Sequence, residues 1–351
     1  MPAPVPAADL VVRRPEGLYC PAGDFFIDPW RKVERAVITH AHADHARTGH
    51  GRYLCAARGL GVLRARLGPV PARGLAWGEP LQVGGVRVSL HPAGHILGAA
   101  QVRLEVAGQV WVVAGDFFAS TLGDVHPTCD PFEPVPCHCF ITEATFGSPI
   151  YRWPRQAAVA DEMLDWWAGN REAGEASLLQ GYSLGKTQHL MARLAQQAGG
   201  VLPGPLYVHP SAEAINAAHA AEGVALPTPR PWGELERAGA AAGALVIAPP
   251  QAQAPWRWQP GLRVREAFAS GWTLTHAGRR RGGLDRGFVL SDHADWPGLL
   301  MAVAATGCEQ VIVTHGDERL LEQAFAERGL ATRRFRTAFG TDAAAEGGPE
   351  G

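Results

Sequence analysis

Short hydrophobic runs that end in glycine or in polar residues fill the first part of the chain. Val86, Val88 and Leu90 alternate with polar residues directly after Gly84-Gly85, which predicts a β-hairpin. The pattern of hydrophobic positions predicts four further short strands, at 36–39, 102–106, 110–113 and 139–142. We therefore expect a β-rich body with tight turns.

The pattern changes to strands that alternate with helices after about residue 147. The run Ser177–Leu179, for example, comes before a helical stretch that includes Leu190. Strand-like runs that end in polar residues resume at 288–290 and 311–313. This alternation is typical of α/β structure. The simplest division is a discontinuous β-rich domain, an α/β insertion and a flexible tail: 1–146 with 288–340, 147–287, and 341–351.

The length and composition indicate a globular protein of two parts. At 351 residues a single hydrophobic core is close to its practical ceiling. A content of 46% hydrophobic and 19% charged residues is ordinary for a globular protein. The formal net charge of −2 neither supports nor excludes a nucleic-acid substrate, because only the local potential at a cleft matters.

Nothing in the sequence indicates a membrane or secreted protein. The chain has no run of about 18 apolar residues, and its first residues lack the apolar segment of a signal peptide. Six cysteines in so long a chain do not make a disulfide scaffold. We expect a cytoplasmic protein with no membrane partner.

The strongest chemical signal is the segment Thr39-His-Ala-His-Ala-Asp-His45, which continues an apolar strand. Residues i and i+2 of an extended segment share one side, so His40 and His42 can converge on one cation. Asp44 and His45 point apart, which suits a second, adjacent cation. A polar surface loop with accidental histidines is the alternative, and the density of potential ligands favours metal binding over it.

A further ligand is expected after the alternating strand at 86–90. His91 and His95 have helical spacing. Pro92 and Gly94 argue against a helix between them, so only one of the two is expected to be a ligand. We choose His95, because it lies in the loop of small residues.

Two more potential ligands end apolar runs. Asp116 ends Val-Val-Ala-Gly-Asp, and its carboxylate can bridge two cations, whereas His315 ends Val-Ile-Val-Thr-His and would complete a second site. Alone, such residues are more often capping or structural. Together with the first cluster, they supply the nitrogen and oxygen ligands of a dinuclear zinc or manganese centre.

In their order along the chain, these residues resemble the metallo-β-lactamase hydrolase superfamily. The resemblance runs from Asp28 to His315, which is nearly the whole chain. Glu143 in Ile-Thr-Glu-Ala-Thr-Phe-Gly, His293 in Leu-Ser-Asp-His-Ala-Asp, and His315 are similar to motifs A, B and C of its β-CASP nuclease branch. Within that branch the chain most resembles the bacterial exonuclease type associated with ATP-dependent DNA ligases. The implied fold is α/β: an αββα sandwich with an inserted α/β β-CASP lobe.

The resemblance also implies a role for individual residues. Two divalent cations, zinc or manganese, would be bound by seven ligands that form a first site, a second site and a bridge: His40, His42 and His95; Asp44, His45 and His315; and Asp116. Asp28, in Phe-Phe-Ile-Asp-Pro-Trp, would support the ligand loop. An aspartate before proline is also a common turn start, which is the alternative for Asp28.

The implied reaction is phosphodiester hydrolysis, in which hydroxide held between the metals attacks phosphorus in line. The residues given catalytic roles are Asp44, Asp116, Glu143 and His293. His293, oriented by Glu143, would contact the phosphate and protonate the departing oxygen. Without the resemblance, an ordinary strand-end carboxylate and a helix-capping histidine explain these two residues about equally well.

The segment Gly181-Tyr-Ser-Leu-Gly185-Lys-Thr187 is close to a phosphate loop but is one residue too short between its glycines. A nucleotide triphosphatase is therefore not expected. The segment instead resembles a helix start of the β-CASP lobe, where Ser183 and Lys186 would bind a backbone phosphate. Ser291 would bind a terminal phosphate. A plain turn and a simple helix cap are equally plausible for these residues.

The resemblance implies an exonuclease of the DNA repair type that prefers DNA to RNA and is functionally associated with an ATP-dependent DNA ligase. Glu143 and His315 are, however, more typical of RNA-processing members, so an RNA-processing β-CASP ribonuclease is the alternative. A small-molecule thioesterase or lactonase of the same superfamily would use the same first cluster. Those enzymes lack a long inserted lobe and the His293 motif.

Overall fold

The computed structural model describes residues 9–237, 239–250, 252, 261–275, 284–316 and 318–335. The chain forms two compact units. Unit 1 contains Met1–Thr121, Cys129–Ile150 and His293–Gly351, and unit 2 contains Leu122–Thr128 and Tyr151–Asp292. The predicted flexible tail, 341–351, lies outside the described residues.

The first sheet of unit 1 is assembled in sequence order from short strands. These are β1 (Val12–Arg14), β2 (Gly17–Cys20), β3 (Phe25–Ile27), β4 (Arg35–Val37), β5 (Arg52–Ala56) and β6 (Ala72–Leu75). β1 to β3 form an antiparallel meander, whereas β3 to β6 run parallel. The strand predicted at 36–39 corresponds to β4, which ends just before the histidine-rich segment.

The second sheet of unit 1 is mixed. Its strands, in spatial order, are β18 (Ala331–Arg334), β17 (Gln310–Gly316), β11 (Cys139–Ala144), β10 (Gln109–Val113), β9 (Ala100–Val106), β8 (Val86–Pro92) and β7 (Leu81–Val83). The predicted hairpin at Gly84-Gly85 is confirmed, because it joins the antiparallel strands β7 and β8. β8, β10, β11 and β17 all run in the same direction, so their carboxyl ends meet at one edge of the sheet.

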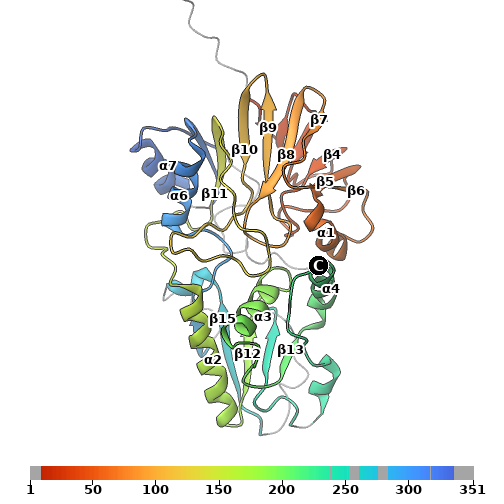
Figure 1. Ribbon diagram of the computed structural model, residues 1–351, viewed down its shortest axis with the longest axis vertical. Helices are drawn as coiled ribbons and strands as arrows, with labels where there is room; N and C mark the ends of the chain where they lie inside the picture. Colours follow the sequence, from red (N-terminus) through yellow and green to blue (C-terminus); the bar gives the residue numbers. More distant parts are fainter. Residues whose placement is uncertain are drawn as a thin grey trace, which may run out of the picture. The chain divides into compact units, whose positions relative to one another are not determined.

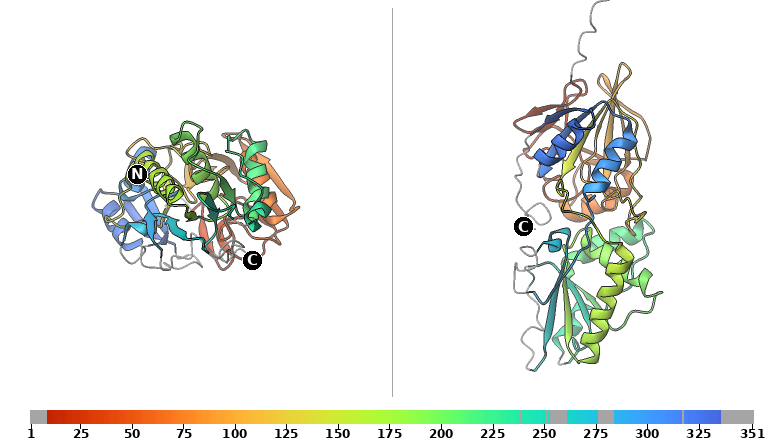
Figure 2. Two further views of the ribbon diagram at one scale, coloured as in Figure 1. Left: turned by 90° about the horizontal axis from the view of Figure 1, so that it is seen from below. Right: turned by 90° about the vertical axis from the view of Figure 1, so that its left-hand side faces the viewer.

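The core of unit 1 lies between the two sheets. Val37 of the first sheet and Ile141 and Ile312 of the second are buried in one hydrophobic cluster. Val311 and Val313 point to the other face of the second sheet and are also buried. Three helices, α1 (Leu60–Leu67), α6 (Trp296–Thr306) and α7 (Glu318–Ala326), pack beside β6, on β11, and on β17 and β18 respectively (Figures 1 and 2). This layering is the αββα sandwich that the sequence implies.

Helix α6 has clear start and stop signals in the sequence. The Asp295 carboxylate accepts a hydrogen bond of 2.9 Å from the backbone N–H of Gly298, and Pro297 occupies the first turn. The helix ends at Gly307, whose φ of 65° lies in the left-handed region that glycine adopts without strain. These caps fix where the chain leaves the segment that contains His293.

Unit 2 is built on a parallel sheet (Figure 1). The spatial order of its strands is β13 (Leu206–Val208), β14 (Leu245–Ala248), β12 (Ala176–Gln180), β15 (Val264–Ala269) and β16 (Arg286–Phe288). Leu179 and Leu178 are neighbours on β12, yet they are buried in two different hydrophobic clusters, one on each face. Burial of both faces explains the continuous hydrophobic runs of this region.

Helices cover the sheet of unit 2. They are α2 (Gln156–Glu172), α3 (Lys186–Gln197) and α4 (Glu213–Ala221), with the 3₁₀ turns η2 (Pro210–Ala212), η3 (Trp232–Glu236) and η5 (Gly271–Leu274). Met163 of α2 and Leu190 of α3 lie in the same cluster as Leu179, whereas Leu235 of η3 lies in the cluster of the opposite face. The expected strand–helix alternation is therefore present.

The structure places the domain boundaries differently from the sequence pattern. The expected boundary at 287/288 falls within β16, which pairs with β15 in the sheet of unit 2, and unit 2 continues to Asp292. Leu122–Thr128 also belongs to unit 2, and unit 1 extends to Ile150 rather than 146. A hydrophobic run indicates that a strand is present, but long-range pairing decides which sheet the strand joins.

Among the described residues, no helix combines the length and the apolar character needed to cross a membrane. The cytoplasmic location stays a prediction.

Candidate metal centre

The histidine-rich segment lies just past the end of β4, where the backbone leaves the sheet. Thr39 donates its N–H to the Asp28 carboxylate, at 2.8 Å. The next residues, from His40 to His45, lie outside the described strands. The ring nitrogens of His40 and His42, Nε2 and Nδ1, are 3.0 Å apart. The two imidazoles therefore lie together, although this segment is not the extended strand from which the sequence argument predicts their convergence.

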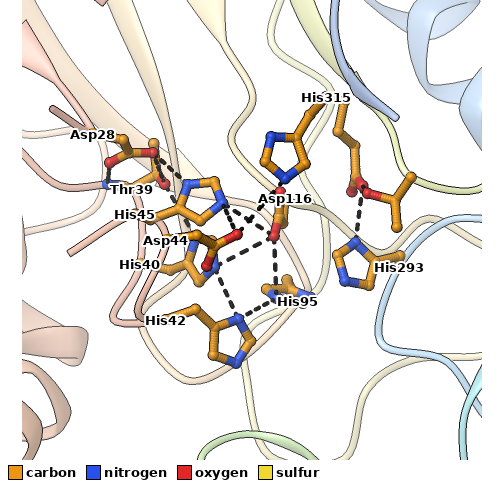
Figure 3. A network of polar contacts seen from close by, with 12 residues as sticks. Asp28, Thr39, His40, His42, Asp44, His45, His95, Asp116, His293 and His315 are labelled. Atoms are coloured by element: carbon orange, nitrogen blue, oxygen red, sulfur yellow. Dashed lines mark hydrogen bonds and ion pairs between the residues drawn. The ribbon is translucent and has the colours of Figure 1, made fainter. Parts of the chain in front are cut away.

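Three other potential ligands come from the second sheet. His95 follows β8, Asp116 follows β10, and His315 lies near the end of β17. Because these strands are parallel, the residues that follow them meet at one edge. In Figure 3 the three side chains converge with those of His40 and His45.

Two unusual backbone positions bring the sheet ligands to this edge. Gly115 precedes Asp116 with a φ of 60°, and a Cβ there would lie 2.7 Å from the Cβ of Thr39. Only glycine fits this position, because any side chain would collide with the ligand loop. His315 has a φ of 57° although it is not glycine. Strained backbone of this kind persists where the surrounding structure enforces it, most often at functional sites.

The strain at His315 is part of an irregularity between β11 and β17. Thr142 pairs with Val313 and Ala144 with Gly316, so β17 has one residue more than β11 between these pairs. The extra residue makes a β-bulge, which redirects side chains. Glu143 and His315 lie within this irregular part of the two strands, so one local feature sets the direction of both side chains.

The first group of potential ligands contains three histidines and one carboxylate: His40, His42, His95 and Asp116. His42 Nδ1 lies 3.1 Å from His95 Nε2, and Asp116 Oδ2 lies 3.5 Å from His40 Nε2 and 3.8 Å from His95 Nε2. The group fits one divalent cation, because neutral imidazole nitrogens and a carboxylate oxygen are ligands of zinc and manganese.

The second group contains Asp44, His45 and His315. His45 Nε2 lies 3.5 Å from Asp44 Oδ2, and His315 Nε2 lies 3.7 Å from the same oxygen. Asp44 Oδ2 and His45 Nε2 are buried and have no hydrogen-bond partner. Buried polar atoms are normally paired, so these two point to a cation that would bind them.

Asp116 lies between the two groups. Its Oδ2 is 3.3 Å from His45 Nε2 as well as close to His40 and His95. Burial acts to raise the pKa of Asp116, but His45 and His40 outweigh it and hold that pKa well below its usual range. The carboxylate is therefore ionised near neutral pH, as a bridging ligand must be.

The two histidines nearest Asp116 respond differently to the same surroundings. Burial, together with the neighbouring His45, holds the pKa of His40 well below its ordinary value. For His45, burial also acts to lower the pKa, but the surrounding carboxylates, Asp116 foremost, hold it well above the ordinary value.

Asp28 supports the ligand loop by two types of contact. Its Oδ2 accepts a hydrogen bond of 2.6 Å from the Thr39 hydroxyl and lies 2.7 Å from His45 Nδ1. The carboxylate therefore orients His45 so that Nε2 faces the site, which is the usual arrangement around a metal-binding histidine. Thr39 also links this carboxylate to His40, because its hydroxyl lies 3.1 Å from His40 Nδ1.

Glu143 and His293 form a second polar pair beside the ligands. His293 Nδ1 lies 2.9 Å from Glu143 Oε2, and the rings of His293 and His95 are 4.5 Å apart between centroids. The Glu143 carboxylate also accepts hydrogen bonds from the Phe117 N–H, at 2.8 Å, and from the Thr145 hydroxyl, at 2.5 Å. These donors fix the carboxylate, and the carboxylate in turn fixes the imidazole.

The choice between His91 and His95 agrees with the geometry. His95 lies in the first group of potential ligands, whereas His91 stays on β8 beside Ser89 and Glu133, with Nδ1 3.4 Å from the Glu133 carboxylate. All seven predicted ligands come together in the two groups, and Asp28 contacts one of them, His45.

The predicted substrate-binding residues lie in unit 2. Lys186 is buried; its Nζ donates to the carbonyl oxygen of Leu290, at 2.9 Å, and lies 3.0 Å from Asp292 Oδ2. The Ser183 hydroxyl, also buried, lies 2.5 Å from the Ser211 hydroxyl. Ser291 is buried as well. In this conformation the charge of Lys186 is paired with Asp292 inside the lobe. Phosphate binding by these three residues stays a prediction.

The sequence does not reveal the role of some residues of the site. Phe117 contributes only a backbone N–H, which no residue pattern reveals. Thr39 and Thr145 flank predicted site residues and orient them through hydroxyl groups, so their proximity in sequence was the available signal. A buried cluster of His126, His189 and Asp292 was also missed, because its members are far apart in sequence.

Several curated proteins are similar to this chain. No family model matches the chain. A protein named "Probable DNA ligase" from Opitutus terrae is 33% identical over 324 residues, which cover 91% of this chain and 30% of that protein. The Drosophila melanogaster protein "Cleavage and polyadenylation specificity factor 73" is 30% identical over 118 residues, 32% of this chain and 16% of that protein. "Endoribonuclease ysh1" from Emericella nidulans is 30% identical over 116 residues, 32% of this chain and 13% of that protein.

The chain spans less than a third of the length of these curated relatives. A solved structure of similar fold is the "Crystal Structure of a Protein of Unknown Function from Enterococcus faecalis V583". It has a TM-score of 0.54 and 13% identity, and the match covers 88% of this chain and 79% of that one. At this identity the likeness concerns the fold alone.

Proposed function

This chain belongs to the β-CASP nucleases of the metallo-β-lactamase superfamily, and from that premise we propose that it is a metal-dependent phosphodiesterase that acts as a DNA exonuclease. One observation carries the proposal: six side chains form two groups of potential ligands with the Asp116 carboxylate between them, and the Glu143–His293 pair lies beside these groups. Phosphodiester hydrolysis requires this combination of cation ligands and a proton donor.

The donor set fits two divalent cations, zinc or manganese. His40, His42 and His95 would hold the first, Asp44, His45 and His315 the second, and Asp116 would contact both. The buried atoms Asp44 Oδ2 and His45 Nε2, which have no hydrogen-bond partner, support this assignment. Bound cations of this kind lower the pKa of water and neutralise charge on a phosphate.

The protein's own side chains would manage the proton on the leaving oxygen. His293 Nδ1 is engaged by the Glu143 carboxylate at 2.9 Å, and Nε2 would contact the substrate. As an imidazolium, His293 can donate a proton to the departing oxygen. In this scheme His293 is a catalytic residue, and Glu143 positions it.

The proposal includes a substrate preference, for DNA over RNA. It is supported by the relative named "Probable DNA ligase", which matches 91% of this chain. Functional association with an ATP-dependent DNA ligase, in DNA repair, belongs to the same proposal. RNA processing is the second candidate, because two other relatives are named as a cleavage and polyadenylation factor and an endoribonuclease.

The test compares matched single strands of DNA and RNA. Both carry the same base sequence and are labelled at either end, and the chelator-stripped protein receives zinc or manganese. We expect stepwise shortening of DNA, faster than of RNA, and no cleavage by an Asp116→Asn variant. Faster cleavage of RNA would replace the DNA assignment, and cleavage of a circular strand would replace the exonuclease assignment. Hydrolysis that survives chelation would overturn the metal-dependent mechanism.

A further inference from the structure

A second buried cluster of histidine and carboxylate groups lies wholly within unit 2. It consists of His126, His189 and Asp292, whose ligand atoms all lie within 4.8 Å of one another. The two imidazole rings are 4.1 Å apart between centroids, and the three side chains are between 0% and 6% exposed. The cluster joins three separate parts of the lobe: the segment Leu122–Thr128, helix α3, and the chain after β16.

Both polar neighbours of the His189 ring are hydrogen-bond acceptors, but the neutral ring has only one N–H to donate. Its Nδ1 contacts Asp292 Oδ1, and its Nε2 lies 3.2 Å from Gln156 Oε1. Arg193 donates a hydrogen bond of 2.7 Å to the same Gln156 oxygen, which fixes that atom as an acceptor. Both nitrogens of His189 therefore face acceptors, although a neutral imidazole has only one N–H. Burial lowers the pKa of His189 to about 3, so the ring is neutral near pH 7.

His126 directs a second nitrogen at Asp292. Its Nε2 is fully buried, has no hydrogen-bond partner and lies 3.4 Å from Asp292 Oδ1. Its Nδ1 accepts a hydrogen bond of 3.3 Å from the Thr128 backbone N–H and lies 3.1 Å from the Thr128 hydroxyl, which can accept a proton. Both histidines therefore direct a nitrogen at one carboxylate oxygen that lies inside the lobe.

We propose that His126 Nε2, His189 Nδ1 and Asp292 Oδ1 bind a third divalent transition-metal ion, such as zinc, as a structural site of unit 2. The ion resolves the deficiency of His189 and gives His126 Nε2 a partner. The ring proton of His189 moves to Nε2 and is donated to Gln156. That of His126 moves to Nδ1 and is donated to the Thr128 hydroxyl, in place of the hydrogen bond of 3.3 Å that the Thr128 backbone N–H makes to this nitrogen. Such outer hydrogen bonds are the usual companions of metal-binding histidines. Two imidazole nitrogens and one carboxylate oxygen are an ordinary zinc ligand set.

Lys186 is compatible with this site because it uses the other carboxylate oxygen. Its Nζ lies 3.0 Å from Asp292 Oδ2, whereas the two histidines face Oδ1. The metal would bind the segment Leu122–Thr128 to helix α3 and would stabilise the lobe. This role does not depend on the proposed nuclease activity.

Metal content of the full-length protein tests the proposal. The chain is stripped with a chelator, reconstituted with Zn²⁺, freed of excess ion by gel filtration and analysed by mass spectrometry of the metal. We expect about three zinc ions per chain for the wild type and about two for His126→Gln. His219→Gln is the matched control, because His219 is also buried in unit 2 but lies outside the cluster, and it should keep about three.

A second measurement separates this site from the centre of unit 1. The double variant His42→Ala/Asp44→Ala removes one potential ligand from each group there, so we expect its remaining zinc to be about one ion per chain. Added Zn²⁺ should raise the melting temperature of this stripped double variant, and adding His126→Gln should abolish the rise. Two zinc ions in the wild type, an unchanged content in His126→Gln, or no response of the double variant to zinc would each overturn the proposed site.

Discussion

The Glu143 carboxylate shows how single contacts define the chemistry of this site. It accepts hydrogen bonds from a backbone N–H and a hydroxyl and engages Nδ1 of His293. Rotation of this carboxylate away from the imidazole would also break its two other hydrogen bonds, which costs free energy. His293 is therefore presented in one orientation beside the potential metal ligands.

Replacing His293 separates proton donation from metal binding. We expect His293→Ala to keep the zinc content of the wild type, because this residue is not among the seven ligands, and to lower kcat by about 10²–10⁴-fold. The measurement combines metal analysis with turnover of a labelled DNA strand. His91→Ala, a change at a histidine away from the site, should leave both quantities unchanged. Normal cleavage by His293→Ala would remove its assigned role.

Asp28 tests whether support of the ligand loop matters for affinity. Its φ is 44°, which asparagine tolerates, so Asp28→Asn keeps the backbone and removes the charge beside His45. We expect about 10–100-fold weaker zinc binding, measured by competition with a chelating dye. Asp24→Asn is the control, because Asp24 also has a positive φ, of 51°, but is paired with Arg35 at the surface. Equal affinities for the two variants would contradict the supporting role.

At the scale of elements, the site depends on the bulge between β11 and β17. Gly316 closes this bulge with a φ of 106°, and a Cβ there would lie 2.1 Å from the carbonyl oxygen of Ala144. That contact is with backbone of the neighbouring strand, which cannot move without breaking the ladder. The bulge sets the direction of both Glu143 and His315. Its geometry therefore affects both metal binding and proton donation, the two functions proposed for the site.

Gly316→Ala should therefore destabilise unit 1 strongly. We expect a loss of about 2–4 kcal/mol in the free energy of unfolding, measured on the stripped protein by urea denaturation. Gly307→Ala provides the comparison, because Gly307 also has a positive φ but its added Cβ would meet no atom within 4 Å. Its cost should be about 1–2 kcal/mol. Similar losses in both variants would mean that the steric contact at the bulge is not decisive.

The elements themselves were largely predictable. Alternation at Val86, Val88 and Leu90 and the Gly84-Gly85 pair gave the β7–β8 hairpin, because side-chain burial on one face imposes a period of two. The bulge was not predictable from the sequence, since Val-Ile-Val-Thr-His reads as an unbroken strand. Its extra residue is visible only against the register of β11.

At the scale of the whole molecule, the two units have separate hydrophobic clusters, and each unit has its own titratable side chains. In unit 2, His219 donates Nδ1–H to the carbonyl oxygen of Ile215, and burial lowers its pKa to about 4. In the unfolded chain a histidine has a pKa of about 6.5. The folded lobe therefore excludes a proton that the unfolded chain binds once the pH falls below that value.

Acidification should consequently destabilise unit 2. The sign follows from the lowered pKa: the contribution of neutral His219 is fully present above about pH 6.5 and is lost as the pH falls towards 4. The full loss is about 3 kcal/mol, at about 1.4 kcal/mol per pKa unit. Melting temperatures between pH 7 and pH 4 should show a weaker pH dependence for His219→Gln than for the wild type. An identical dependence would contradict the assignment.

The sequence by itself determined the local elements and the identity of the chemical groups. Residue type and spacing identified the imidazoles and carboxylates of the His40–His45 segment, and a prolyl break excluded a helix that would have joined His91 to His95. Such conclusions need only neighbouring residues, because periodicity and turn chemistry act over a few positions.

The tertiary structure alone decided which distant residues meet. Asp28 and Thr39 join across two strands, a bulge aligns His315 with Glu143, and Asp292 gathers His126 and His189 inside the lobe. These encounters depend on strand register and chain closure, which are set by burial of the whole core and not by any local pattern. For the same reason Lys186, which reads as an available cation in the sequence, is an internal partner of Asp292 in the folded chain.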